Sequence, residues 1–270
     1  MPDNRVEGFA WQVGVWERMA DVYRREIDSR FGPVIEAVLK RAELMPGETV
    51  LDLGTGTGAV AILAATQVGS TGRIKAVDIS PEMLTRAGER VRELQLTNID
   101  LAEGRAEAIP ADDRSVDAVI ASLSLMYVID RAAAAMEIAR VLRPGGRLVA
   151  AVWAGPGEAD IVRFQQTAGS FAPTPPVRGV GPGALGDPSE FLSQLRAAGL
   201  DAKCEKVTTT FEFASFQDAW DALAGVTAAT LEPKVQEEAK AAVCALMWLD
   251  AAGPRTFHNV TQLISARKAA

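Results

Sequence analysis

The chain has 270 residues, of which 48% are hydrophobic and 23% charged, and its formal net charge is −7. This composition is typical of a soluble globular protein, and the acidic balance argues against a nucleic-acid surface, which needs basic patches to meet phosphates. Cys204 and Cys244 lie far apart without metal-ligand spacing, which argues against a zinc site or disulfide framework and favours a reducing, cytoplasmic setting. The sequence has no apolar run long enough for a membrane span, so we expect no membrane partner.

The first segment, residues 9–43, is predicted to be helical because apolar side chains recur there at helical spacing. Gly32 and Pro33 indicate that one helix ends and another begins at that point. The segment is also rich in aromatic residues, with Trp11, Trp16 and Tyr23. These rings either pack the helix onto the core or form a lid over a ligand.

A glycine-rich turn follows the first predicted strand. Residues 50–58 read Val-Leu-Asp-Leu-Gly-Thr-Gly-Thr-Gly, a short buried strand and then a turn whose backbone can approach a ligand closely. Residues 73–77 predict a second strand, and Asp78 stands at its carboxyl end. Ligands of open α/β sheets bind at that edge, where a carboxylate can accept hydrogen bonds from both ribose hydroxyls. The pattern therefore predicts an adenosine-type cofactor across the first two strand ends.

The spacing of the glycines bears on which cofactor this is. A dinucleotide site usually reads G-x-G-x-x-G, whereas this turn reads G-x-G-x-G with Asp52 two residues before the first glycine. An acid at that place would repel a pyrophosphate and suits a cationic amino-acid ligand. Asp52 thus disfavours a nicotinamide-dependent oxidoreductase, which is one alternative function.

Four stretches of the chain together resemble the class I S-adenosylmethionine (SAM)-dependent methyltransferases, in particular the small-molecule branch that includes the ubiquinone/menaquinone C-methyltransferases. The resemblance covers about residues 45–153. The stretches that carry it are Val50–Gly58, Ala76–Leu84, Gly104–Pro110 with Ser115–Val119, and Ala139–Leu148.

The resemblance implies a set of cofactor-binding residues in the glycine turn, at the second strand end and in the loops after the third and fourth strands. They are Asp52, Gly54, Thr55, Gly56, Gly58, Asp78, Ile79, Met83, Arg105, Ala106, Glu107 and Ser122. Tyr23 is the implied lid residue over the methyl donor. One position departs from the family, since Arg105 stands where an Asp or Asn usually accepts a bond from the adenine amino group. Arginine has donors only, so we expect Arg105 to stack on the adenine face while Ala106 offers its N–H.

The rest of the chain adds elements that complete a sheet. Helices are predicted over 81–94, 131–142, 159–171, 189–198, 216–223 and 233–249, and strands over 99–101, 116–121, 147–153, 201–213 and 259–267. The stretch 172–188 is rich in Pro and Gly and is predicted to be a lid or mobile loop.

The fold class expected from these elements is α/β, a doubly wound, mostly parallel sheet of seven strands (a Rossmann-like methyltransferase fold) with a helical cap. Five strands are parallel, and the last two form a hairpin at one edge. We expect a single domain over 1–270, with an N-terminal helical lid (1–43) and a SAM-binding core (44–153). A lid loop, strand and helical cap (154–250) and a final strand (251–270) complete it.

The chemistry expected of this fold is in-line transfer of a methyl group from the SAM sulfonium to a small molecule. The loop 122–128 lacks the histidine that such enzymes often carry, so the candidate bases are Tyr127 and the sole histidine, His258. Candidate pocket residues are apolar or aromatic, which favours a hydrophobic or aromatic acceptor: Trp11, Trp16, Met19, Leu125, Met126, Trp153, Phe171, Trp220, Met247 and Trp248. A second alternative is a SAM-binding protein that acts as a cyclase or regulator, and homo-oligomer formation stays open. No His/Cys/Asp cluster suggests a metal.

Overall fold

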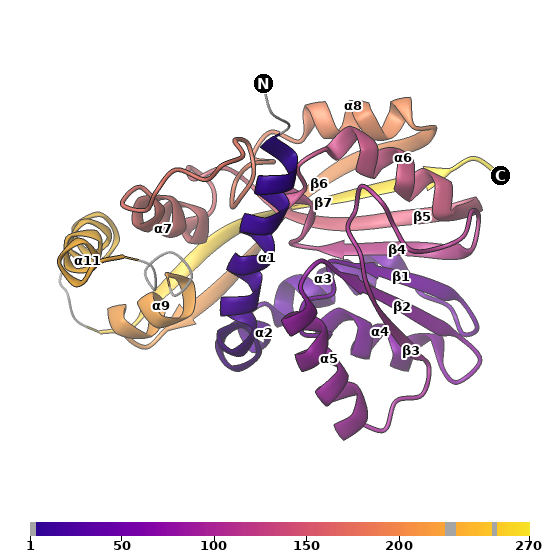
Figure 1. Cartoon of the computed structure of the whole chain (residues 1–270), viewed down its shortest axis with the longest axis horizontal. Helices are drawn as coiled ribbons and strands as arrows, with labels where there is room; N and C mark the ends of the chain where they lie inside the picture. Colours follow the sequence, from indigo (N-terminus) through magenta and orange to yellow (C-terminus); the bar gives the residue numbers. More distant parts are fainter. Residues whose placement is uncertain (1–3, 225–230, 250–252) are drawn as a thin grey trace.

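The computed structural model describes residues 4–224, 231–249 and 253–270, and its centre is a seven-stranded sheet in the order β3-β2-β1-β4-β5-β7-β6 (Figure 1). Strands β1 to β5 are parallel, and β7 is antiparallel to both of its neighbours. The predicted sheet, with an antiparallel pair at one edge, is confirmed. The strands are β1 (Thr49–Leu53), β2 (Arg73–Asp78), β3 (Ile99–Glu103), β4 (Val116–Ser122), β5 (Leu142–Trp153), β6 (Leu200–Phe213) and β7 (Arg255–Lys268).

Helices cover both faces of the parallel half of the sheet. On one face lie α3 (Gly32–Ala42), α4 (Ala59–Val68) and α5 (Pro81–Glu93), and on the other lie α6 (Arg131–Val141) and α8 (Ser189–Ala197) (Figure 1). Because both faces are covered, the central strands are mainly apolar rather than alternating. Val50 and Leu51 in β1 and Val119 and Ile120 in β4 are fully buried.

The N-terminal helices form a separate wall over the carboxyl ends of the strands. Helix α1 (Asn4–Val22) continues into a π-helical turn, η1 (Tyr23–Ile27), and then into the short α2 (Asp28–Arg30) (Figure 1). The predicted helical segment and its restart at Gly32 are confirmed, but the π-helical turn has no signal in the sequence pattern. Such turns insert an extra residue into a helix and often occur at functional sites.

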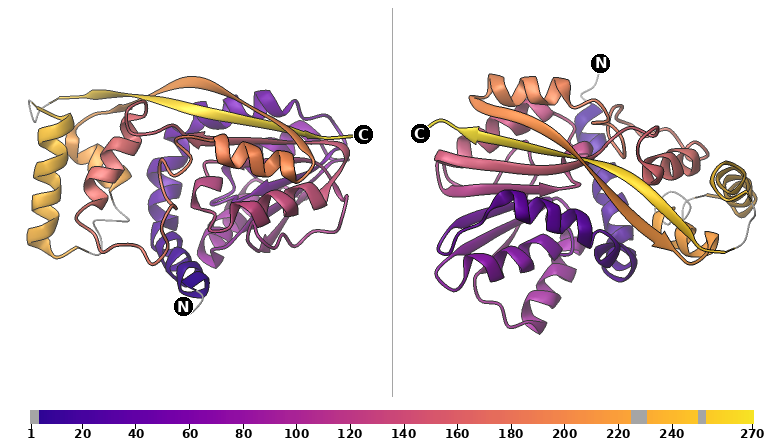
Figure 2. Two further views of the ribbon diagram at one scale, coloured as in Figure 1. Left: turned by 90° about the horizontal axis from the view of Figure 1, so that it is seen from above. Right: turned by 180° about the vertical axis from the view of Figure 1, so that it is seen from behind.

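The ribbon formed by β6 and β7 is longer than the rest of the sheet. Residues 261–267 of β7 pair with β5, whereas residues 255–260 continue past β5, where β6 is the strand that pairs with them and Asn259 makes one bridge to Ala159. This overhang carries α7 (Asp160–Gly169), α9 (Phe216–Leu223) and α11 (Pro233–Met247), with α11 packed on α7 (Figure 2). The helices expected as a cap over 215–250 thus lie mainly beside the sheet.

Hydrogen bonds fasten the Pro/Gly-rich stretch 172–188 to its surroundings at several points. The N–H of Gly181 donates to the Met126 carbonyl (3.0 Å), and Arg131 Nη2 donates to the Gly179 carbonyl (2.6 Å). The buried Gln262 donates to the Leu185 carbonyl (2.8 Å). The stretch therefore braces the loop after β4.

Within the described ranges, no helix combines the length and apolarity that crossing a bilayer requires.

Candidate active site

A large cavity opens at the carboxyl ends of β1, β2 and β4, beneath α1. We call it the outer chamber; it encloses about 1030 Å³ including its open mouth, a size typical of ligand sites. Twelve of the residues predicted for the site line it: Tyr23, Gly54, Thr55, Gly56, Asp78, Ile79, Met83, Arg105, Ala106, Glu107, Ser122 and Tyr127. Three predicted residues do not, namely Asp52, Gly58 and His258.

The glycine turn forms the floor of the outer chamber. The N–H groups of Gly54 and Thr55 both donate to the Val77 carbonyl (2.8 and 2.9 Å), which fixes the turn against β2. A Cβ on Gly54 would lie 2.4 Å from Cβ of Ser124, so no larger residue fits there. Gly56 has a φ of 55°, and no atom of the described residues lies within 4 Å of the place that a Cβ would take, because its open side faces the chamber. Gly54 thus makes the turn compact, and Gly56 leaves space for a ligand.

Gly58 has a different role from the one predicted. Its φ is 85°, and a Cβ would lie 3.2 Å from Cβ of Ala87 in α5. It lets α4 begin close to α5 and contributes no chamber surface. The structure thus gives Gly58 a role in helix packing.

Asp78 lies at the chamber wall with both carboxylate oxygens engaged by the backbone. The N–H of Gly56 donates to Oδ2 (2.8 Å), and the N–H of Ser80 donates to Oδ1 (2.9 Å). Burial raises the pKa of Asp78, while these N–H bonds act against that shift. Each oxygen keeps lone-pair capacity for a ligand hydroxyl. Asp78 therefore both shapes the turn and is placed to accept hydrogen bonds from a ligand.

Asp52 lies behind the chamber floor. Its side chain is 1% exposed, and Oδ2 accepts a hydrogen bond from Thr55 Oγ1 (2.6 Å). Its other oxygen is buried, and the backbone N–H of Ala61 acts on the carboxyl to lower its pKa. Burial raises the pKa of Asp52 to about 7, and the charge of Asp78 acts in the same direction. Thr55, rather than Asp52, provides the chamber surface at this point.

A third acid, Asp28, was not foreseen from the sequence. It follows the π-helical turn and lines the outer chamber. Its Oδ2 accepts hydrogen bonds from Thr57 Oγ1 (2.5 Å) and from Arg90 Nη1 (2.6 Å). Burial raises the pKa of Asp28, as it does for Asp52 and Asp78. Asp28 is thus paired with a cation of the protein, whereas Asp52 and Asp78 favour a positively charged ligand. Nothing local in the sequence marks Asp28, because only the fold brings it to Thr57.

The mouth of the outer chamber is bounded by Phe9 and Arg105. The Arg105 guanidinium lies over the Phe9 ring, 4.5 Å from its centroid, so this side chain stacks on a ring of the protein. The Glu107 side chain binds the loop after β4, because its Oε1 accepts hydrogen bonds from the N–H groups of Ile129 and Asp130 (3.0 and 3.2 Å). The loop after β3 is thereby tied to the loop after β4.

The end of β4 is strained where it meets the chamber. Leu123 is buried and has a φ of 58°, a left-handed conformation that is rare for a branched residue. Ser124 Oγ donates to the Leu53 carbonyl (2.7 Å) and so ties this loop to β1. Backbone strain of this kind persists where the surroundings fix it, and it is concentrated at functional sites.

Behind the outer chamber lies a smaller one that shares five of its lining residues. This inner chamber measures about 430 Å³ when the solvent space at its open side is counted, and it is lined by Trp16, Met19, Tyr23, Ile27, Phe31, Leu123, Tyr127, Trp153, Gln165 and Ala222. Its rings meet edge to face: Trp16 lies 4.7 Å from Tyr127 and 6.3 Å from Tyr23 between centroids. Of the predicted pocket residues, six line neither chamber: Trp11, Met126, Phe171, Trp220, Met247 and Trp248.

The two predicted bases differ in position. Tyr127 lines both chambers, but burial raises the pKa of its phenol, as it does for Tyr23, so both hydroxyls keep their protons at neutral pH. These hydroxyls are hydrogen-bond donors to a ligand rather than bases. His258 is exposed on β7, where its backbone N–H donates to Asp160 Oδ2 (2.8 Å). The prediction of His258 as base is wrong in position, because β7 carries it out of both chambers.

Comparison with known proteins agrees with this geometry. Residues 51–150, from the middle of β1 to β5, match the family model described as a methyltransferase domain. The chain carries a class I SAM-dependent methyltransferase domain. The predicted family is thereby confirmed.

Curated relatives match the methyltransferase domain over part of their length. An arsenite methyltransferase from Halobacterium salinarum is 39% identical over 107 residues, which is 40% of this chain and 27% of the relative. A ubiquinone/menaquinone biosynthesis C-methyltransferase from Enterobacter sp. (strain 638) is 38% identical over 104 residues, which is 38% of this chain and 41% of the relative. The chain thus matches less than half the length of either protein.

Solved structures match over a larger share of the chain. The YcgJ protein from Bacillus subtilis has a TM-score of 0.65 and 21% identity, covering 88% of this chain and 99% of that one. The 4+2 cyclase SpnF has a TM-score of 0.59 and 25% identity, covering 88% of this chain and 80% of that one. The fold therefore extends well beyond the matched residues 51–150.

The residues of the outer chamber fit SAM, the cofactor of this family. Gly56 leaves its side of the turn open, Asp78 presents a carboxylate for hydroxyls, and Asp52 keeps a buried carboxyl behind Thr55. A sulfonium and an ammonium group would offset the negative charge of these acids.

In the described ranges, no three His, Cys, Asp or Glu residues are arranged to hold a metal ion.

Proposed function

We propose that the protein transfers a methyl group from SAM to a small hydrophobic or aromatic molecule. The observation that carries this proposal is the pair of joined chambers, one acidic and built on the glycine turn, the other apolar and lined by aromatic rings. Tyr23, Trp16 and Tyr127 belong to both, so they stand where donor and acceptor would meet.

When bound, SAM supplies a methyl group on sulfur that an acceptor displaces in line, the S–C bond breaking as the new bond forms. The protein's part is to hold both molecules and to exclude water. We assign the contacts with SAM to Gly54, Thr55, Gly56, Asp78, Ile79, Met83, Arg105, Ala106, Glu107 and Ser122, with Asp52 acting through charge. Tyr23, between the two chambers, would orient the reacting groups with its protonated hydroxyl. Among the described residues, neither chamber offers a basic nitrogen other than Arg105, so the acceptor must react without a histidine or lysine base.

Arsenite is a poor fit as acceptor. Trivalent arsenic is a soft centre that prefers thiolate ligands. The two cysteines, Cys204 on β6 and Cys244 on α11, line neither chamber. The resemblance to an arsenite methyltransferase therefore supports the cofactor half of the site alone.

An alternative is that the protein binds SAM and performs other work, such as a cyclisation. The likeness to SpnF and the absence of a histidine from the described linings of both chambers favour it. A screen of phenolic and quinone acceptors with trideuteromethyl-labelled SAM separates the two functions by mass spectrometry. Methyl transfer predicts a labelled product with the parent protein and none with Gly56→Val. SAM binding without any labelled product across the screen would favour the alternative.

A further inference from the structure

The inner chamber has a lining that selects against charge. None of its ten described lining residues carries an ionised side chain at neutral pH: the polar groups are the phenols of Tyr23 and Tyr127, two indole N–H groups and the amide of Gln165. Moving a charged group from water into such a lining is costly unless a partner of opposite charge is present. The acids of the outer chamber are negative, so a carboxylate ligand would also be repelled.

The walls of the inner chamber suit a flat ring. Phe31 lies 5.5 Å from Trp153 and 6.2 Å from Tyr23 between ring centroids, and Trp16 closes the side toward Tyr127. Aromatic rings attract one another in edge-to-face or offset arrangements at such separations. A ligand ring in this space would make the same kind of contact with several walls at once.

Gln165 is the one amide side chain among the described residues of this lining. It projects from α7, is half-buried, and its Nε2 reaches the Leu223 carbonyl only at 3.5 Å, the outer limit of a hydrogen bond. Its Oε1 meets no donor among the described residues. The adjacent Gln166 differs, because it is exposed, lines neither chamber and donates to the Pro182 carbonyl (3.3 Å).

We infer that the inner chamber binds an uncharged aromatic ring that carries a hydroxyl, and that Gln165 is the residue that selects the hydroxyl. This inference rests on the proposed function, since it identifies the class of acceptor. The ligand hydroxyl donates to Gln165 Oε1, which accepts no other hydrogen bond from the described residues. The rings of the chamber enclose the rest of the molecule. Gln165 is a specificity-determining residue and takes no part in the transfer itself.

Three small probes of equal width test the inference by binding alone. p-Cresol and p-xylene differ only in a hydroxyl against a methyl group, and 4-methylbenzoate adds a negative charge. Dissociation constants are measured by ligand-observed NMR with the protein saturated with S-adenosylhomocysteine, the demethylated cofactor. We expect p-cresol to bind about threefold to tenfold more tightly than p-xylene, the value of one neutral hydrogen bond, and 4-methylbenzoate to bind most weakly.

Variants of the two neighbouring glutamines provide the matched control. Gln165→Leu should abolish the preference for p-cresol over p-xylene while leaving p-xylene binding unchanged or tighter. Gln166→Leu should keep the preference, and so should Gln165→Glu, which keeps an acceptor oxygen at that place. Because Gln165→Leu is expected to keep its p-xylene binding while losing the preference, a general loss of folding cannot imitate the result.

Several results would overturn the inference: equal binding of p-cresol and p-xylene to the parent, tightest binding of 4-methylbenzoate, or an unchanged preference in Gln165→Leu. Absence of binding by every probe would do so as well. The titrations are repeated without S-adenosylhomocysteine. Failure of the proposed function would then appear as failure of this cofactor to bind, while the preference of the inner chamber for p-cresol is still measured.

Discussion

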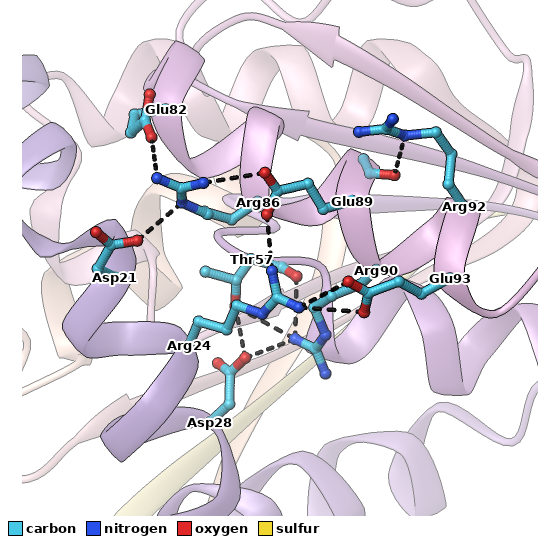
Figure 3. Close-up of polar contacts among 11 residues, drawn as sticks. Asp21, Arg24, Asp28, Thr57, Glu82, Arg86, Glu89, Arg90, Arg92 and Glu93 are labelled. Atoms are coloured by element: carbon cyan, nitrogen blue, oxygen red, sulfur yellow. Dashed lines mark hydrogen bonds and ion pairs between the residues drawn. The ribbon is translucent and has the colours of Figure 1, made fainter.

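Asp28 and Arg90 form an enclosed ion pair between the N-terminal helices and α5, with Oδ2 and Nη1 2.6 Å apart and side chains 11% and 24% exposed. Arg90 also donates to the Thr57 carbonyl (3.0 Å), so the pair fastens the end of η1 to the glycine turn. Two further arginine contacts, Arg24 with Glu89 (2.7 Å) and Arg86 with Asp21 (2.9 Å), run alongside it (Figure 3). The wall that α1 makes over the outer chamber is thus held to α5 by charge.

Breaking this fastening should loosen the wall without altering its surface. Arg90 lines neither chamber, so Arg90→Gln tests the fastening alone. We expect the backbone amides over residues 9–30 to exchange faster. The free energy of opening these amides should fall by up to that of a charged hydrogen bond, about 1.5–3 kcal/mol. Hydrogen exchange with mass spectrometry measures this. The control is Arg92→Gln on the same helix, because Arg92 Nε donates within that helix to the Gly88 carbonyl (3.2 Å) (Figure 3). Equal exchange in the two variants would show that the pair does not hold the wall.

Asp78 should matter for both binding and stability. Replacing it with Asn removes the charge and one of the two acceptor oxygens that Gly56 and Ser80 engage. We expect Asp78→Asn to weaken SAM binding by about 1.5–3 kcal/mol, the range for hydrogen bonds to a charged group, and to lower the melting temperature. Glu103→Gln is the control, since Glu103 stands opposite Asp78 in the register of β2 and β3 but is exposed. Calorimetry that gives Asp78→Asn the parent's affinity would remove Asp78 from the site.

Asp52 should make SAM binding depend on pH. Burial raises the pKa of Asp52 to about 7, whereas an unfolded Asp ionises near about 4. Between these values the folded carboxyl retains a proton that the unfolded one has lost, so this group makes the ligand-free protein less stable as the pH rises through that window. A cationic ligand favours the ionised carboxylate. SAM should therefore bind more tightly at about pH 8 than at about pH 6 and release protons on binding.

The contribution of Asp52 is isolated by comparing the parent with Asp52→Asn. The variant keeps an oxygen to accept the Thr55 hydroxyl but cannot ionise. We expect the difference in SAM affinity between the two pH values to shrink in the variant, as measured by calorimetry in two buffers of different ionisation enthalpy. Because the ligand's own titration affects both proteins alike, an identical pH dependence would exclude Asp52 as the group responsible.

Gly54 and Gly56 should respond differently to the same substitution. Gly54→Ala would place a Cβ 2.4 Å from Ser124, so we expect it to unfold at a clearly lower temperature, since overpacking costs about 1–3 kcal/mol in addition to the strain of a positive φ. Gly56→Ala meets no atom of the described residues within 4 Å, so it should cost about 1–2 kcal/mol from its φ alone. Its methyl group would nevertheless enter the chamber and weaken SAM binding. Thermal unfolding and calorimetry on both variants test this, and the reverse order of stability would contradict it.

The sheet and much of the outer chamber could be predicted because their signals are local. Apolar runs mark the buried strands, and the glycine turn with Asp78 at the next strand end marks the ligand edge of such a sheet. Residues next to the glycine turn or to Asp78 in sequence, such as Thr55 and Ile79, are therefore found at the chamber wall. Asp52 and Gly58 lie outside the chamber lining, because a motif gives position along the chain but not which side of the turn faces the chamber.

The features that escaped prediction depend on contacts between distant segments. Asp28 reaches Thr57 because of the π-helical turn, which has no periodic signature, and Gln165 reaches the inner chamber from α7 on the β6–β7 overhang. The length of that overhang depends on how far β6 pairs with β7, and these two strands are separated in the sequence by α9 and α11. Composition likewise could not show that the aromatic residues Trp11 and Trp248 lie outside both chambers while Phe31 lies inside.

The most direct test of the account is a calorimetric comparison of SAM with NAD on the parent protein. The acids around the glycine turn favour a cationic ligand and disfavour a pyrophosphate. We predict that SAM binds with a dissociation constant in the low micromolar range or below, about −8 kcal/mol, and that NAD binds far more weakly. Tighter binding of NAD than of SAM would contradict the assignment of the outer chamber.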